Sequence, residues 1–155
     1  MKLQLQRETL LKPLQMVIGV VERKQTMPIL SNILLDTKDA RLTITGTDTE
    51  VELIGVSPLD EQLHFDRLTL PGRKLMDICK ALPEGADIEL SREKGQIILR
   101  SGRSRFTLST LPAEDFPNIE EHDAQFTLNV KAADFRHLLQ RSHFAMAQQD
   151  VRYYL

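Results

Sequence analysis

Two carboxylates, Asp48 and Glu50, have the spacing in this chain that best suits metal or acid–base chemistry. Thr47 and Thr49 flank and separate them, so four consecutive residues carry side-chain oxygens. A carboxylate pair can hold a divalent cation such as Mg²⁺ or share a proton. Aspartate and threonine also form tight turns by hydrogen-bonding to nearby backbone amides. We interpret the segment as a turn, and a small metal-dependent nucleic-acid enzyme is the alternative that it leaves open.

The other residue types that commonly do chemistry are few and scattered. Cys79 is the single cysteine, which excludes an intrachain disulfide, and its place in an apolar helical pattern indicates a buried structural thiol rather than a nucleophile. The histidines, at positions 64, 122, 137 and 143, have no metal-ligand spacing. The sequence has no glycine-rich phosphate loop, no HExxH motif and no defensible Ser-His-Asp set. We therefore expect no catalytic residue, no metal and no cofactor.

Composition places the chain among ordinary globular proteins. Its 155 residues are 41% hydrophobic and 27% charged, and they suffice for one domain or for one domain and part of another. No apolar run approaches the roughly 20 residues of a membrane helix. Arg7, Glu8 and Lys12 argue against a secretory signal. Together with the single cysteine, these features predict a reducing, cytoplasmic location and no membrane partner.

The periodicity of the apolar residues predicts an α+β unit over residues 2–109. One helix begins at Glu8, with leucines at helical spacing, and a second spans residues 72–82. The other segments alternate polar and apolar residues or form short apolar runs between turn residues, which is typical of strands. We expect strands at 2–6, 29–35, 42–46, 50–56, 65–70, 87–91, 96–100 and 104–109. This order predicts one sheet with two helices.

A similar pattern begins again after a linker. Residues 111–121 contain two prolines and several acidic residues, which is typical of a linker. Residues 126–130 then resemble the first strand, and residues 132–142 form a predicted helix. Three apolar residues of that helix are expected to face inward, namely Phe135, Leu138 and Leu139.

The two patterns are offset by 123 to 124 residues, which indicates a duplicated domain. Residues 149–155 occupy the place of the strand that follows the first helix in the first copy. We therefore expect a first domain at 1–120 and the truncated start of a second, similar domain at 121–155. Such a stub cannot bury its helix against a complete sheet, so we expect it to be marginally stable or to pair with another copy.

The positive charge is concentrated in the predicted helices. Residues 7–24, 72–82 and 131–141 each carry a net charge of +2, whereas the whole chain has −2, so the remainder carries −8. Basic helices on an acidic body suggest one surface that faces a polyanion, with salt-sensitive binding to phosphates rather than to bases. The alternative is that these residues simply solvate the outer faces of the helices.

Several runs along the chain form a recognisable set, namely Leu10-Leu11-Lys12-Pro13-Leu14, Pro28-Ile29-Leu30-Ser31-Asn32, Gly46-Thr47-Asp48, Ser101-Gly102-Arg103-Ser104-Arg105-Phe106, Asp115-Phe116-Pro117 and the whole of 144–155. These runs resemble the bacterial DNA polymerase III β subunit, the sliding-clamp family. The resemblance covers the chain in order, and 144–155 is its most specific part. It implies the DNA clamp fold, with helices packed on a curved antiparallel sheet, followed by the start of a second similar domain.

What the family does is implied by the resemblance alone. Two chains of three similar domains form a head-to-tail homodimeric ring, which encircles duplex DNA and contacts its phosphate backbone without reading sequence. The ring is a non-catalytic processivity factor that tethers the DNA polymerase III α subunit, and it is a partner of the clamp loader and of other clamp-binding proteins. A tethered polymerase rebinds before it diffuses away, because its effective concentration is high.

The resemblance also assigns residues to two sites near the end of the chain. Lys24, Gln149, Tyr153 and Tyr154 match positions that contact DNA in the family. Arg152, Tyr154 and Leu155 match one wall of the pocket for clamp-binding peptides. The alternatives from residue type alone are a solvated lysine and tyrosines that pack in a core.

A third assignment is the first-domain half of the subunit interface, at Lys74, Arg103, Arg105, Phe106 and Leu108. Arg103 and Arg105 alternate with uncharged residues along a predicted strand and are therefore expected to share one face. An edge strand with neighbouring arginines would repel a copy of itself and favour an acidic partner edge. The alternative for these residues is a merely solvated edge strand. For the chain as a whole, a protein-interaction module without a DNA role also remains open.

Overall fold

The computed structural model describes residues 2–21, 27–60, 65–117 and 126–146. The chain divides into two compact units, Met1–Ile119 and Glu120–Leu155. We describe each unit by itself.

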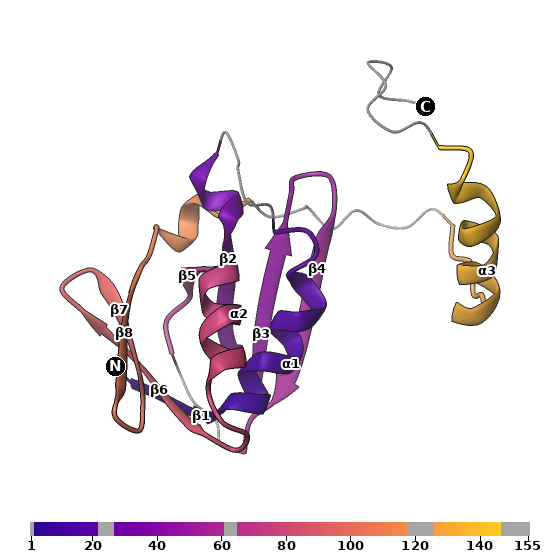
Figure 1. The fold of residues 1–155 in the computed structure, drawn as a ribbon. Coiled ribbons are helices and arrows are strands. Elements are labelled where there is room, and N and C mark those ends of the chain that lie inside the picture. The colour runs from indigo at the N-terminus through magenta and orange to yellow at the C-terminus, as the bar shows by residue number, and fades with distance from the viewer. Residues whose placement is uncertain (1, 22–26, 61–64, 118–125, 147–155) are drawn as a thin grey trace. The chain divides into compact units, whose positions relative to one another are not determined.

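The described part of the first unit contains two four-stranded antiparallel sheets and two α-helices (Figure 1). The first sheet has the order β1 (Lys2–Gln6), β6 (Asp87–Glu93), β7 (Gln96–Ser101) and β8 (Ser104–Ser109). The second has the order β4 (Glu52–Pro58), β3 (Arg41–Thr47), β2 (Asn32–Lys38) and β5 (Leu68–Pro71). The helices are α1 (Arg7–Val17) and α2 (Gly72–Ala81), and 3₁₀ turns occupy Pro28–Ser31 (η1) and Ala113–Asp115 (η2).

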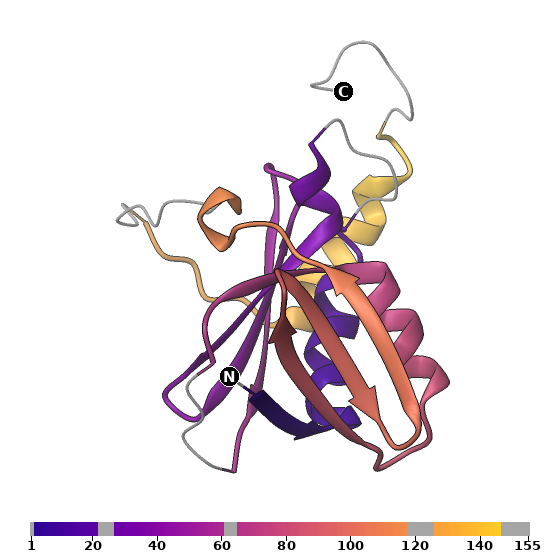
Figure 2. The ribbon, with the colours of Figure 1, turned by 90° about the vertical axis from the view of Figure 1, so that its left-hand side faces the viewer.

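The α+β class is confirmed, but the prediction of a single sheet is wrong. The first strand pairs with β6, more than 80 positions along the chain, rather than with the strand that follows the first helix. The strands β2 to β5 pair only among themselves. Figure 2 shows the first sheet with β8 at its end. Non-local pairing of this kind leaves no signal in hydrophobic periodicity, which reports only which face of a strand is buried.

One hydrophobic core joins both sheets and both helices. The helices place Leu10, Leu14 and Leu75 at zero exposure, and the sheets meet them with Leu3 and Ile44. Each fully buried leucine or isoleucine contributes about 1.5–3 kcal/mol relative to an exposed one. This shared core makes the first unit a single folding body.

The backbone of α1 lies close against the second sheet at Gly55. A Cβ atom built on Gly55 would lie 2.6 Å from the carbonyl oxygen of Pro13 and 2.8 Å from its Cα. Pro13 lies inside α1 and is buried. The missing side chain on β4 therefore allows the helix backbone to rest directly on the strand.

Two predicted strands begin later than expected. Residues 28–31 form a 3₁₀ turn, because Pro28 starts a helical turn well and the Ser31 hydroxyl donates to the Pro28 carbonyl at 2.7 Å. The strand predicted at 65–70 begins at Leu68. The backbone of Phe65 bonds instead to the Thr37 hydroxyl, donating at 2.8 Å and accepting at 3.2 Å.

The second unit contains α3 (Ala132–His143), which confirms the predicted helix. The predicted strand at 126–130 is wrong, because these residues have no strand partner within the described part of the chain. The expectation that Phe135, Leu138 and Leu139 face inward is also wrong, since they are 52%, 65% and 53% exposed. The apolar face of α3 is therefore uncovered in the described residues.

Substituting Gly55→Ala should lower the free energy of unfolding by about 1–3 kcal/mol, because the new methyl group would collide with the Pro13 backbone. Urea unfolding followed by circular dichroism measures the change. Gly19→Ala is the matched control, since nothing lies within 4 Å of a Cβ at that position, and it should change stability by less than about 0.5 kcal/mol. Equal effects of both substitutions would contradict the close-contact interpretation.

Candidate functional site

The Asp48 carboxylate is used within its own turn. Its Oδ1 atom accepts hydrogen bonds from the backbone amides of Glu50, at 3.0 Å, and Val51, at 2.7 Å. The Thr47 hydroxyl accepts from the Thr49 amide at 3.0 Å and donates to the Val51 carbonyl at 2.9 Å. The turn interpretation is confirmed. Within the described ranges, no group of three or more His, Cys, Asp and Glu side chains is arranged to hold a metal ion.

The thiol of Cys79 is a structural group of the core. It is fully buried on α2, and burial raises its pKa to about 11. Because the thiolate is the nucleophilic form, a raised pKa keeps the group unreactive near neutral pH. The prediction of a buried structural thiol is confirmed.

One of the basic residues counted in the first helix serves to join the two helices. The Arg7 guanidinium donates to the Cys79 carbonyl on α2 at 2.6 Å and to the Glu8 carboxylate at 2.8 Å. The hydrogen bond from Arg7 lowers the pKa of the Glu8 carboxyl group. Arg7 therefore fixes α1 against α2, and its charge is largely neutralised by Glu8.

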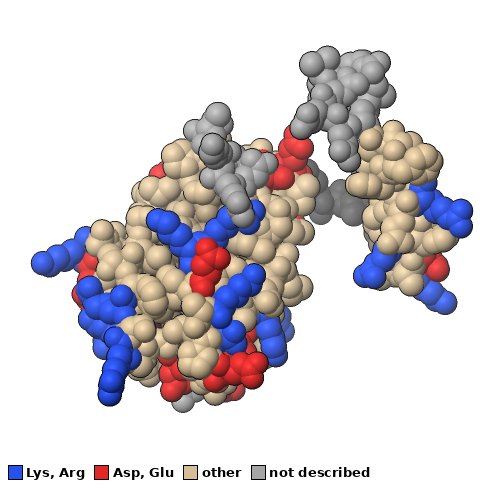
Figure 3. Space-filling view, in the orientation of Figure 1, with Lys and Arg blue, Asp and Glu red and all other residues tan. Residues whose placement is uncertain are grey.

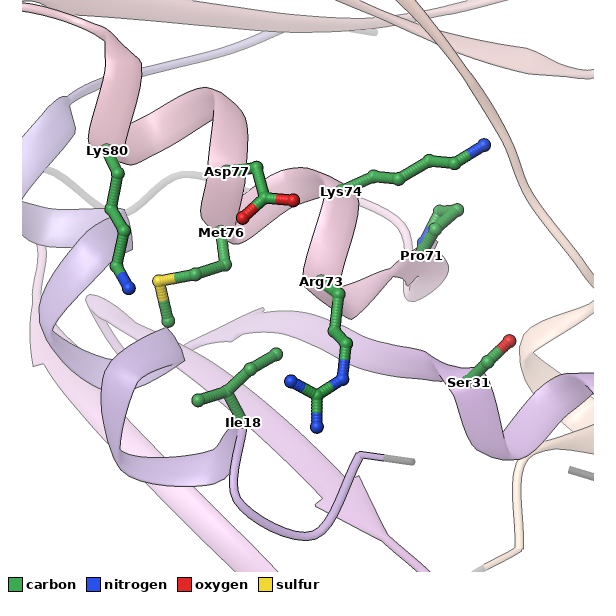
Figure 4. Close-up of a pocket in the computed structure, with 8 residues that line it drawn as sticks. All are labelled: Ile18, Ser31, Pro71, Arg73, Lys74, Met76, Asp77 and Lys80. Carbon is green, nitrogen blue, oxygen red and sulfur yellow. The ribbon is translucent and has the colours of Figure 1, made fainter. Parts of the chain in front are cut away.

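Three cations of α2 lie around one cavity. A cavity of about 490 Å³ is lined by Ile18, Ser31, Pro71, Arg73, Lys74, Met76, Asp77 and Lys80. In Figure 4, Arg73 extends toward Ile18, while Lys74 extends away along the side of Pro71. Figure 3 shows lysine and arginine side chains gathered on this side of the first unit, with fewer acidic ones between them.

Arg73 is held by the chain that follows α1. Its Nε atom donates to the Val21 carbonyl at 3.0 Å, so the side chain is fixed while its charge stays at the cavity. Arg73, Asp77 and Lys80 recur at helical spacing, which places them on one face of α2. Sequence reasoning counted these charges but did not single out Arg73 or Lys80; the spacing was the signal available.

The β7–β8 hairpin carries four of the five residues assigned to an interface. Arg103 lies in the turn before β8, next to Gly102 with φ +54°, so the expectation that it shares a strand face with Arg105 is wrong. Arg105 is exposed on β8, which ends its sheet. Phe106 is half-buried against the core, and Leu108 is buried in it.

Leu108 therefore has no side-chain surface of its own to offer, because it is only 4% exposed. The fifth residue, Lys74, is exposed on the first turn of α2 and lines the cavity. The structure thus distributes the predicted interface residues over two elements, α2 and the β7–β8 hairpin. The other assigned residues lie outside the described residues: Lys24, Gln149, Arg152, Tyr153, Tyr154 and Leu155.

Comparisons with known proteins identify the family of this chain. Residues 1–120 match the family model described as DNA polymerase III beta subunit, N-terminal domain. The chain belongs to this family. The resemblance found in the sequence runs is thereby confirmed, as is the clamp type of α+β fold.

Relatives named β sliding clamp extend the match beyond residue 120. The chain is 55% identical to the protein from Pseudomonas putida over 151 residues, which is 97% of this chain and 41% of the relative. It is 46% identical to the Escherichia coli protein over 155 residues, which is 100% of this chain and 42% of that one. The chain therefore spans about two fifths of the length of these relatives.

Solved structures of the family agree in fold. The crystal structure of the DNA polymerase III subunit beta from Pseudomonas aeruginosa superposes with a TM-score of 0.91 at 51% identity, covering 99% of this chain and 42% of that one. The Caulobacter crescentus protein gives a TM-score of 0.88 at 39% identity, covering 100% and 42%. In the described residues, no helix has the length and apolarity needed to cross a membrane.

Removing the Asp48 carboxylate should affect stability and nothing else. Asp48→Ala should lower the free energy of unfolding by about 1–2 kcal/mol, because two backbone amides lose their acceptor. Glu50→Ala is the control and should change it by less than about 0.5 kcal/mol. Thermal unfolding with and without Mg²⁺ checks the metal alternative: a Mg²⁺-dependent rise in midpoint that both substitutions abolish would contradict the turn role.

Proposed function

We propose that the first unit is the N-terminal domain of a sliding clamp, a ring that encircles duplex DNA and tethers the replicative polymerase. The observation that carries the proposal is the arrangement of charge on a clamp-family domain. Cations surround the cavity beside α2, whereas Arg103 and Arg105 lie on the hairpin that ends the first sheet. One surface therefore suits a polyanion, and a separate strand edge suits a partner.

The helix surface suits the phosphate backbone. Arg73 is oriented by its bond to the Val21 carbonyl, so it loses less conformational freedom on binding than a free side chain would. Lys74 and Lys80 add point charges around the same cavity. Nothing in this set matches a base edge, and contacts of this kind give salt-dependent binding without sequence preference.

The remaining DNA and peptide assignments belong to the same proposal. Lys24, Gln149, Tyr153 and Tyr154 would contact DNA, and Arg152, Tyr154 and Leu155 would form one wall of a pocket for clamp-binding peptides. The family match and the identity over the whole length support them. The partners would be the DNA polymerase III α subunit, the clamp loader and other clamp-binding proteins.

The hairpin and α2 would form one half of a head-to-tail homodimer interface. Lys74, Arg103 and Arg105 supply positive charge, Phe106 supplies a partly exposed aromatic ring, and Leu108 supports the strand from the core. An acidic strand edge is the partner that fits, since two copies of this edge would repel each other.

Such a ring needs no catalytic group, and we propose that this chain acts without one, in the cytoplasm. The enzyme alternative rested on Asp48 and Glu50, and the Asp48 carboxylate is bonded to two backbone amides. Processivity would come from effective concentration, because a polymerase that releases DNA stays close enough to rebind.

Encirclement of DNA can be tested by comparing retention on circular and on linear DNA. We define the completed clamp as this 155-residue chain followed by the remainder of the Pseudomonas putida β sliding clamp. Loaded onto nicked circular DNA by a clamp loader, the completed clamp should remain bound through gel filtration at high salt and should dissociate within minutes once the circle is cut. Equal retention on circular and linear DNA would contradict encirclement.

The α2 surface predicts a defined salt effect. For the completed clamp on linear duplex DNA, Arg73→Ala with Lys80→Ala should reduce the slope of log affinity against log salt by about 2 per chain, if each residue meets one phosphate. Lys38→Ala with Arg41→Ala is the control, because it removes two exposed cations from the β2–β3 turn. Fluorescence anisotropy measures both slopes, and an equal reduction would show general charge rather than this surface.

A further inference from the structure

The outer face of the first sheet places two arginines directly opposite each other at its edge. The cross-strand register aligns Glu89 on β6, Arg100 on β7 and Arg105 on β8 in one row. Like charges directly opposite one another on neighbouring strands are destabilising. A nearby acidic group would offset the repulsion between Arg100 and Arg105.

Glu93 is the group that does so. Its Oε1 atom lies 3.3 Å from Nη2 of Arg100, and its Oε2 atom lies 3.6 Å from Nη2 of Arg105. Arg100 also pairs with Glu89, since its Nη1 atom lies 3.7 Å from Oε1 of Glu89. The Nζ atom of Lys2 lies 3.1 Å from the same oxygen. A chain of alternating charges thus crosses all four strands, and among the described residues Glu93 is its only link to β8.

The contact from Glu93 to Arg100 is part of the packing of the sheet. Glu93 pairs with Gln96, so it lies two rows away from Arg100 along the strands, and the row between contains Ile98. Ile98 is on the outer face, yet it is only 2% exposed. The long side chains that meet above this row can exclude water from Ile98, which ties the position of Glu93 to the burial of an apolar residue.

We propose that Glu93 is an intramolecular competitor for Arg105 that limits the strength of the subunit contact at the β8 edge; this inference rests on the proposed function. Glu93 holds the Arg105 guanidinium on its own sheet and offsets part of its charge. An acidic partner edge must then displace Glu93 to pair fully with Arg105. Glu93 is therefore a positioning residue that keeps a closed interface weaker than its arginines alone would make it.

Loss of the Glu93 charge should change the stability of the domain and the affinity of the dimer in opposite directions. Without its charge, Glu93 no longer offsets the opposed arginines, so the domain should lose stability. The same change leaves Arg105 unpaired in the free subunit, so an acidic partner should bind more tightly. A residue with a merely structural role would weaken both.

The test uses Glu93→Gln in the completed clamp, with the dimer dissociation constant measured by sedimentation. The variant should dimerise about two- to fivefold more tightly at low salt, the range expected for partly exposed ion pairs, and the difference should vanish near 1 M salt. Glu93→Asp, which is too short to reach both arginines, should act in the same direction. Urea unfolding of the same samples verifies that each variant folds.

Two further variants make the outcome decisive. Glu89→Gln is the matched control, since Glu89 also approaches Arg100 but has no contact with Arg105, and it should leave dimerisation unchanged. Combining Glu93→Gln with Arg105→Gln should abolish the gain. An unchanged or weaker dimer for folded Glu93→Gln overturns the proposal, while loss of dimerisation by Arg105→Gln alone still supports the interface. No effect of Arg105→Gln would overturn both.

Discussion

The structure depends on a single hydrophobic core that both sheets and both helices must share. Neither four-stranded sheet can cover its own apolar face, and α1 and α2 together bury both. The fit is limited by backbone contact, because Gly55 lets the helix at Pro13 rest on β4 without an intervening side chain. Once these apolar faces are committed to the core, the outer faces of the helices and sheets and the free edges of the sheets remain for function.

Each of these remaining surfaces carries its own kind of charge arrangement. On the helices, Arg7 is engaged in the contact between α1 and α2, whereas Arg73, Lys74 and Lys80 of α2 line a cavity. On the sheet edge, Arg105 is balanced by Glu93 from the same domain. The cations beside α2 share their face with one carboxylate, Asp77, whereas at the sheet edge Arg105 has an ion-pair partner within its own domain.

Sequence reasoning succeeded where residue type determined local structure. Asp48 was predicted to shape a turn, and Cys79 to be a buried thiol, because their side-chain chemistry limits the alternatives. It failed where strand pairing between distant parts of the chain determines the sheet order, since no local pattern shows that β1 pairs with β6. Leu108 could have been placed in the core from the alternation along β8, which exposes Arg105 and turns Phe106 and Leu108 toward the core. The link from Glu93 to Arg105 could not have been found, because it joins strands that are not neighbours in the sheet.

We propose that β8 is left unpaired on one side so that a partner strand can complete the sheet. Amide hydrogen exchange on β8, compared between the 155-residue chain and the assembled completed clamp, measures whether a strand joins this edge. The β8 amides that do not bond to β7 should exchange quickly in the isolated chain and at least about tenfold more slowly in the ring. Identical exchange rates in the two states would show that no strand joins this edge and would contradict the account.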